Sequence, residues 1–171
     1  HVYVTGFSNG AAMCFELAGH FADRIAAIAP VAGYCRAKVT PSRPVPTLYI
    51  IGADDPMTPP LGGTVTSPWT GETLQRPPAF DELDRWAGLI GCRTPREFIS
   101  EADGIRTDRY AGPVEFLAMT VEGLGHHWPG GRGQLKRKLA GLPSDRLDAN
   151  STVWEFFRRH RLGESHSAAA T

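Results

Sequence analysis

Residues 1–10 read H-V-Y-V-T-G-F-S-N-G, and this stretch decides which fold we expect. The run V-Y-V-T consists of β-branched and aromatic residues, which predict a short buried strand. The apolar and small residues that follow, from 9 to 21, predict a helix. Ser8 therefore lies in the tight turn that joins a strand to a helix.

This turn carries the pattern G-x-S-x-G over residues 6–10. Between a strand and a helix the pattern indicates a nucleophile elbow, a sharp turn that exposes a serine hydroxyl and strains its backbone. Glycines on both sides let the strand and the helix approach without Cβ clashes. The alternative is a glycine-rich turn whose serine only caps the helix. The pattern makes Ser8 a candidate nucleophile.

Three further apolar runs, at residues 25–33, 47–52 and 114–121, predict the other main strands. None of them shows polar alternation, which is typical of strands covered by helices on both faces. A short antiparallel pair is expected over residues 96–110. Because strands alternate with helices along the chain, we expect an α/β fold with a mostly parallel sheet.

Two more helices are predicted, at residues 79–90 and 151–160, the second with Ser151 as its N-cap. The apolar side chains expected in the core from the three helices are Met13, Leu17 and Phe21, then Phe80, Leu83, Trp86 and Ile90, and finally Trp154. Residues 56–79 are rich in Pro, Gly and Thr and are expected to form a long loop.

The chain is long enough for one domain with a hydrophobic core, expected over residues 1–162, while the low-complexity tail 163–171 is expected to be disordered. It carries 18 Lys and Arg against 18 Asp and Glu, so its formal net charge is zero. This balance argues against nucleic acid or an anionic membrane surface as a partner. No apolar run approaches the length of about 18 residues that a membrane span needs.

The three cysteines, Cys14, Cys35 and Cys92, lack the CxxC spacing that is typical of zinc sites. Buried apolar thiols and a disulfide between Cys35 and Cys92 are both compatible with this spacing. The cysteines therefore leave the redox compartment open.

A serine hydroxyl is a poor nucleophile and needs a histidine base that is itself oriented by a carboxylate. In folds with a nucleophile elbow, these residues follow in the chain order Ser, Asp, His. Asp54 and Asp55 come directly after the strand predicted at 47–52. The carboxyl ends of parallel strands meet at one edge of a sheet, where a crevice forms. The alternative is a simple turn built on Asp-Pro.

His126 and His127 follow the strand predicted at 114–121 within a glycine-rich loop. Adjacent histidines point in different directions, so only one of them can act as the base. They also lack the i, i+4 spacing of two metal ligands on a helix. The alternative is a polar surface loop. Three strand-end motifs in the required order together favour a catalytic Ser-Asp-His set.

Three segments carry a wider likeness: V-Y-V-T-G-F-S-N-G-A-A-M at 2–13, R-P-V-P-T-L-Y-I-I-G-A-D-D-P-M-T-P at 43–59, and G-L-G-H-H-W-P-G-G at 123–131. Together they resemble the polyhydroxybutyrate-depolymerase-like esterases, an α/β-hydrolase family that includes feruloyl and acetylxylan esterases. The likeness runs from residue 1 to about residue 161. It implies an α/β-hydrolase fold.

The resemblance also implies a role for each candidate. Ser8 matches the family's nucleophile, Asp55 its carboxylate and His126 its base, in preference to the neighbouring Asp54 and His127. It implies no metal and no organic cofactor.

The resembling fold also implies an oxyanion donor, and the loops near the site suggest where substrate would lie. The backbone N–H of Asn9, the residue after the nucleophile, is the expected oxyanion donor. Trp128 and the 56–79 loop are expected substrate walls, and for Trp128 the alternative is ordinary packing against its loop.

In the resembling fold the nucleophile follows the fifth strand, whereas here it follows the first. We therefore expect the chain to be the C-terminal part of a longer esterase that lacks its N-terminal strands. The missing part would hold the loop with the second oxyanion donor. Residues 1–171 alone are then expected to be poorly soluble and almost inactive, and the upstream half to restore both properties.

The sequence thus predicts a serine carboxylesterase that acts on a polyhydroxyalkanoate-type polyester or on a feruloyl or acetyl sugar ester. The family resemblance implies secretion or a periplasmic location. Two alternatives stay open: a serine peptidase or thioesterase on the same fold, and a non-catalytic remnant that keeps the motifs.

Overall fold

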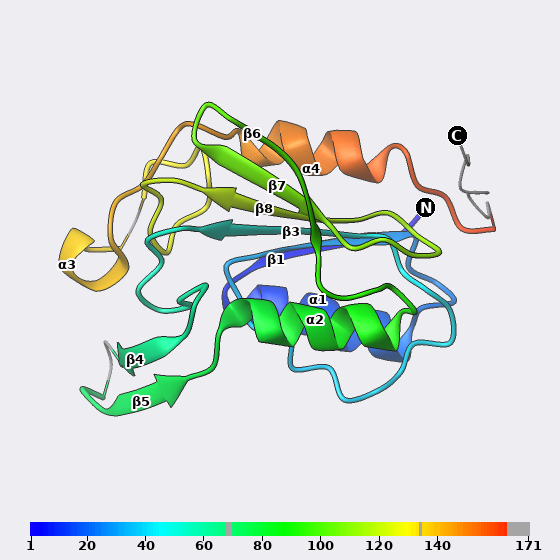
Figure 1. Cartoon of the computed structure of the whole chain (residues 1–171), viewed down its shortest axis with the longest axis horizontal. Coiled ribbons are helices and arrows are strands. Elements are labelled where there is room, and N and C mark those ends of the chain that lie inside the picture. Colours follow the sequence, from blue (N-terminus) through cyan, green and yellow to red (C-terminus); the bar gives the residue numbers. More distant parts are fainter. Residues whose placement is uncertain (68–69, 134, 164–171) are drawn as a thin grey trace.

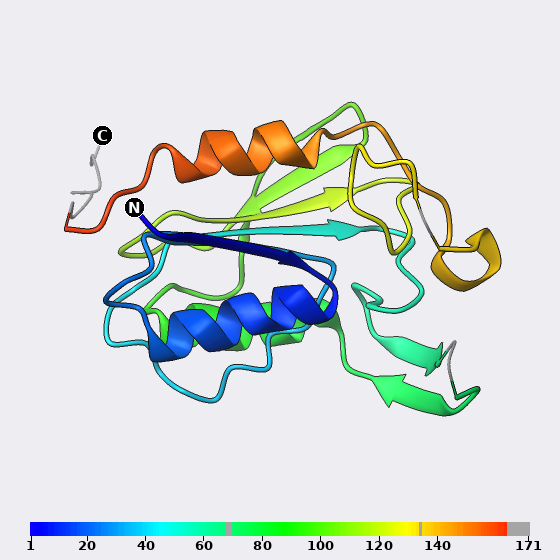
Figure 2. The ribbon, with the colours of Figure 1, turned by 180° about the vertical axis from the view of Figure 1, so that it is seen from behind.

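The computed structural model describes residues 1–67, 70–133 and 135–163; most of the tail predicted to be disordered, from 164 on, lies outside these residues. A six-stranded sheet is covered by α1 and α2 on one face and by α4 on the other (Figures 1 and 2). The strands lie in the order β1 (Tyr3–Phe7), β2 (Ala27–Val31), β3 (Thr47–Gly52), β8 (Phe116–Val121), β7 (Ile105–Arg109) and β6 (Glu97–Ala102).

The first four strands of this order are parallel, and β7 and β6 continue the sheet antiparallel. Four parallel strands in a six-stranded sheet confirm the expected α/β class with a mostly parallel sheet. Every residue of β2 and β3 is buried, as their unbroken apolar runs predict. β1 is the outer strand of the described sheet and is only half-buried, because β2 is its single neighbour there.

The helices are α1 (Asn9–His20), α2 (Ala79–Leu89), the short α3 (Arg137–Ala140) and α4 (Ala149–Phe157). One core lies between the sheet and α1 with α2, where the Phe15 and Trp86 rings meet edge to face at 5.3 Å between centroids. The Trp86 indole also donates a hydrogen bond to the Thr47 hydroxyl. The second core lies under α4 and includes Phe156 and Leu48.

The core-facing side of α1 differs from the prediction at two of the three positions, while Leu17 packs against the core as expected. Met13 and Phe21 are 55% and 47% exposed, and the buried residues are Ala11, Cys14, Phe15, Ala18 and Gly19. Four of these residues, from 11 to 18, also follow the i, i+3, i+4, i+7 spacing of a helix face. On that face the small residues surround Phe15, whose ring fills the space toward α2.

The terminal helix also differs in two respects. It begins at Ala149, and its N-cap is Asp148, whose carboxylate accepts hydrogen bonds from the N–H groups of Asn150 and Ser151. The predicted cap Ser151 therefore lies inside the first turn. Trp154, expected in the core, is 60% exposed. The expected burial of Trp86 and of the rest of the α2 stripe is confirmed.

The expected long loop at 56–79 contains a hairpin of two short antiparallel strands, β4 (Gly63–Thr66) and β5 (Thr73–Arg76). Most residues of the hairpin are exposed, and exposed strands need no alternation of apolar and polar residues. The sequence therefore lacks the pattern that would have predicted these strands. The hairpin lies at the end of the sheet to which β3 and β8 point (Figure 1). The three cysteines are free and buried, so no disulfide joins Cys35 and Cys92.

Candidate active site

Ser8 lies in the turn between β1 and α1 with φ 57° and ψ −114°, a conformation that L-residues rarely adopt. The turn holds because its neighbours are small. A Cβ on Gly6 would lie 2.5 Å from the Gly10 carbonyl carbon, and a Cβ on Gly33 would lie 2.2 Å from the Ser8 carbonyl oxygen. The Ser8 N–H also donates to the Val31 carbonyl at 2.9 Å. This is the strained strand–turn–helix geometry that the sequence predicts.

Asp55 follows β3 and is buried. Its Oδ1 accepts hydrogen bonds from the backbone N–H groups of Met57 at 2.8 Å and Thr58 at 2.7 Å. These bonds hold the carboxylate so that Oδ2 points away from its own loop, toward the loop after β8. The carboxylate therefore has one oxygen bound by backbone and the other free for a partner side chain.

That partner is His126, which lies in the loop after β8 and is also buried. Its N–H donates to the Ala140 carbonyl at 2.6 Å, and its ring lies 4.7 Å from the Phe7 ring, centroid to centroid. The loop passes close to β3, since a Cβ on Gly52 would lie 2.0 Å from the Leu124 carbonyl oxygen. Close backbone packing thus fixes the position of the imidazole.

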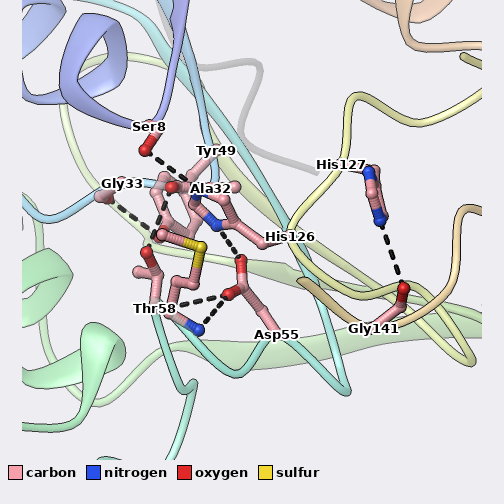
Figure 3. A network of polar contacts seen from close by, with 10 residues as sticks. Ser8, Ala32, Gly33, Tyr49, Asp55, Thr58, His126, His127 and Gly141 are labelled. Atoms are coloured by element: carbon pink, nitrogen blue, oxygen red, sulfur yellow. Dashed lines mark hydrogen bonds and ion pairs between the residues drawn. The ribbon is translucent and has the colours of Figure 1, made fainter. Parts of the chain in front are cut away.

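The three side chains form one hydrogen-bonded line (Figure 3). His126 Nδ1 lies 2.8 Å from Asp55 Oδ2, and His126 Nε2 lies 2.9 Å from Ser8 Oγ. A carboxylate can only accept a hydrogen bond, so Nδ1 carries the proton and Nε2 presents its lone pair to the serine hydroxyl. In this tautomer the imidazole can take the Ser8 proton as a base.

The neighbouring Asp and His residues are not part of this line. Asp54 is exposed. His127 turns away, with its Nε2 3.3 Å from the Gly141 carbonyl oxygen (Figure 3). The structure therefore brings Asp55 and His126, rather than Asp54 and His127, to Ser8.

A cavity of about 250 Å³ opens over the serine, and Ser8, Asn9 and His126 are among its lining residues. Asn9 is the first residue of α1, so its N–H is one of the donors that a helix start leaves without an intrahelical acceptor. An N–H at this position is the kind of donor that the oxyanion of acyl transfer needs. The β4–β5 hairpin, within the 56–79 loop, forms a wall of the cavity through Val65 and Leu74.

Trp128 is not among the residues that line this cavity. Its indole donates to the Asn150 side chain at 3.1 Å, and the ring packs against the core under α4. The geometry thus matches the packing alternative for Trp128.

Two hydroxyl groups that the sequence analysis does not single out bind the backbone that follows β2, next to the site. The Tyr49 hydroxyl donates to the Gly33 carbonyl at 3.0 Å, and the Thr58 hydroxyl donates to the Ala32 carbonyl at 3.2 Å (Figure 3). Burial raises the pKa of Tyr49 well above its usual value, so the phenol keeps its proton. Their only sequence signal is that they lie in or just after β3, beside the Asp55 loop.

In the described ranges, no group of three or more His, Cys, Asp or Glu side chains could hold a metal ion. No helix among the described residues is long and apolar enough to cross a membrane.

No family model matches the chain. The chain is 31% identical over 182 residues, 91% of its length, to a protein from Nocardia uniformis subsp. tsuyamanensis named "Putative esterase NocK". It spans 50% of the length of that relative. The strained serine, the buried histidine and the carboxylate thus lie in a chain that is similar, over half of the relative's length, to a protein named as an esterase.

Proposed function

We propose that this chain is the catalytic part of a serine carboxylesterase with the α/β-hydrolase fold. The observation that carries the proposal is the hydrogen-bonded line from Ser8 through His126 to Asp55, on the loops after β1, β8 and β3. The chain order Ser, Asp, His agrees with that fold. The name of NocK favours ester hydrolysis over peptide or thioester hydrolysis, which the same three side chains can perform.

In the proposed mechanism, Ser8 Oγ attacks the ester carbonyl while His126 Nε2 accepts its proton. The Asn9 N–H donates to the oxyanion of the tetrahedral intermediate. His126 then gives the proton to the leaving alkoxide, and the acyl group stays on the serine. Water attacks this acyl-enzyme with His126 as base, and His126 returns that proton to Ser8 Oγ as the acid leaves. Asp55 holds the imidazole in its working tautomer through both steps.

The finer assignments rest on the resemblance in the sequence. They are membership of the polyhydroxybutyrate-depolymerase-like group, a polyester or a feruloyl or acetyl sugar ester as substrate, and secretion or a periplasmic location. The cavity wall at the β4–β5 hairpin agrees with a substrate that extends beyond the serine along that hairpin.

The test is serine labelling and turnover in the protein that carries this chain. Ser8→Ala is expected to lower p-nitrophenyl acetate hydrolysis by several orders of magnitude and to abolish labelling by a fluorophosphonate, with the circular dichroism spectrum unchanged. Ser100→Ala, on the exposed strand β6, is the matched control and should change neither readout. Fluorophosphonate on a different residue would refute the assignment.

A further inference from the structure

A second hollow, of about 520 Å³, adjoins the cavity over Ser8. Tyr34, Arg36 and Arg76 line both spaces. Tyr34 and Arg36 follow β2 and Arg76 ends β5, so the loop after a sheet strand and the hairpin meet at this point. A substrate bound at Ser8 can therefore reach two guanidinium groups.

Three of the cationic side chains that line these spaces form no ion pair with a described carboxylate. Arg36, Arg76 and Lys38, which lines the second hollow, make no ion pair with any described residue, whereas the nearby Arg85 is paired with Glu82 at 2.7 Å. In the lining of the Ser8 cavity, Glu72 is the single carboxylate against the two arginines, and it accepts a hydrogen bond from the Thr70 hydroxyl. The lining of both spaces thus carries excess positive charge.

The Arg76 side chain has a donor that no described residue satisfies. Its Nε is buried and has no hydrogen-bond acceptor among the described residues. The side chain is held in place, because its guanidinium carbon lies 5.7 Å from the centre of the Tyr34 ring and the Tyr34 hydroxyl donates to the Pro77 carbonyl at 3.3 Å. A buried donor without an acceptor costs free energy, and an anionic ligand group would remove that cost.

We propose that Arg36 and Arg76 form a subsite for a carboxylate on the ester substrate. The subsite lies where the cavity over Ser8 meets the second hollow, beside the ester bond that Ser8 cleaves. The proposal rests on the proposed esterase function and narrows its substrate class to esters that carry an acid group. A guanidinium binds a carboxylate through parallel N–H donors, which orients the substrate as well as attracting it.

The test compares matched esters with and without the carboxylate. For the acyl side, mono(4-nitrophenyl) glutarate is compared with 4-nitrophenyl butyrate; for the alcohol side, 3-acetoxybenzoate is compared with phenyl acetate. In at least one pair we expect kcat/KM to be about ten- to a hundred-fold higher for the anionic ester, as for one charged hydrogen bond. The preference should fall as salt is raised.

Variants distinguish binding of the carboxylate at Arg76 from a long-range effect of the protein's net charge. Arg76→Gln should abolish the kcat/KM preference for the anionic ester of the pair, while Arg76→Lys should keep part of it. Arg161→Gln removes the same charge at an exposed residue that lines neither space, and the preference should survive. Thermal unfolding by circular dichroism identifies any variant that fails to fold.

A binding measurement does not depend on turnover. Calorimetry of the intact glutarate ester with the Ser8→Ala variant should show binding that is lost when Arg76→Gln is added. Equal kcat/KM in both ester pairs, or undiminished binding after Arg76→Gln, would overturn the subsite while leaving the esterase proposal in place. Absence of fluorophosphonate labelling and of all ester hydrolysis, with binding to the subsite retained, would instead refute the esterase proposal alone.

Discussion

The sharpest test of the proposed mechanism is the exchange Asp55→Asn, because the structure dictates how the new amide must lie. The N–H groups of Met57 and Thr58 both donate to Oδ1, at 2.8 and 2.7 Å. The amide oxygen must therefore occupy that position, since an NH₂ group there would face two donors. The amide NH₂ then points at His126 Nδ1, where Oδ2 lies at 2.8 Å in the natural protein.

An NH₂ group donates, so it forces Nδ1 to accept and moves the imidazole proton to Nε2. Nε2 can then no longer take the proton of Ser8, although it keeps its place 2.9 Å from the hydroxyl. The same exchange in a serine-protease triad lowers kcat by roughly 10⁴-fold, which corresponds to about 5 kcal/mol of transition-state stabilisation. We expect a loss of that order here, with KM nearly unchanged.

The assay is steady-state hydrolysis of p-nitrophenyl acetate at constant pH in the protein that carries this chain. Asp54→Asn is the matched control, because it removes the same charge from the adjacent exposed residue. It should retain nearly full activity. If Asp55→Asn kept more than about a tenth of the natural kcat while folded, the tautomer argument would be wrong and Asp55 would have only a structural role.

Three further predictions concern the fold around the site. Gly33→Ala places a methyl group 2.2 Å from the Ser8 carbonyl oxygen, so it should lower the free energy of unfolding by several kcal/mol in urea titrations. Gly88→Ala is the control, because a Cβ there meets nothing within 4 Å; it should be neutral or stabilising by up to about 1 kcal/mol. Burial raises the pKa of Cys14 and Cys35 to about 12, so peptide mapping should find both unmodified by a maleimide at pH 8 until the protein is unfolded. Asp108→Ala leaves two arginines without their buried partner and should cost about 1–3 kcal/mol in the same titrations; a change below about 0.5 kcal/mol would contradict this.

Several elements were predictable because their signals are local. The strand at 47–52 and the helix at 79–90 differ from β3 and α2 by at most one residue, since each is an apolar pattern whose period matches its structure. The serine turn was predictable for a related reason. Only small neighbours permit a residue with φ 57° between a strand and a helix, and the glycines display that requirement in the sequence.

Side-chain size misled the prediction at the helix surfaces. Met13 and Trp154 are large apolar side chains, yet both are exposed, and α1 packs through Phe15 together with alanines and a cysteine. How closely a helix approaches the sheet depends on what lies opposite it. The sequence of the helix alone does not contain that information.

The sequence by itself determined which strand ends carry a serine, an aspartate pair and a histidine pair, because each motif lies within a few residues of its strand. The choice of Asp55 and His126 rested on family resemblance, and the geometry agrees with it because two backbone N–H groups orient the carboxylate and the Ala140 carbonyl binds the His126 N–H. Only the tertiary structure brings Arg36 and Arg76 to one place, 40 residues apart in the chain. No local pattern links the two arginines. They meet because the β4–β5 hairpin lies at the end of the sheet to which β3 and β8 point, and Arg76 at its end lines the same cavity as Arg36.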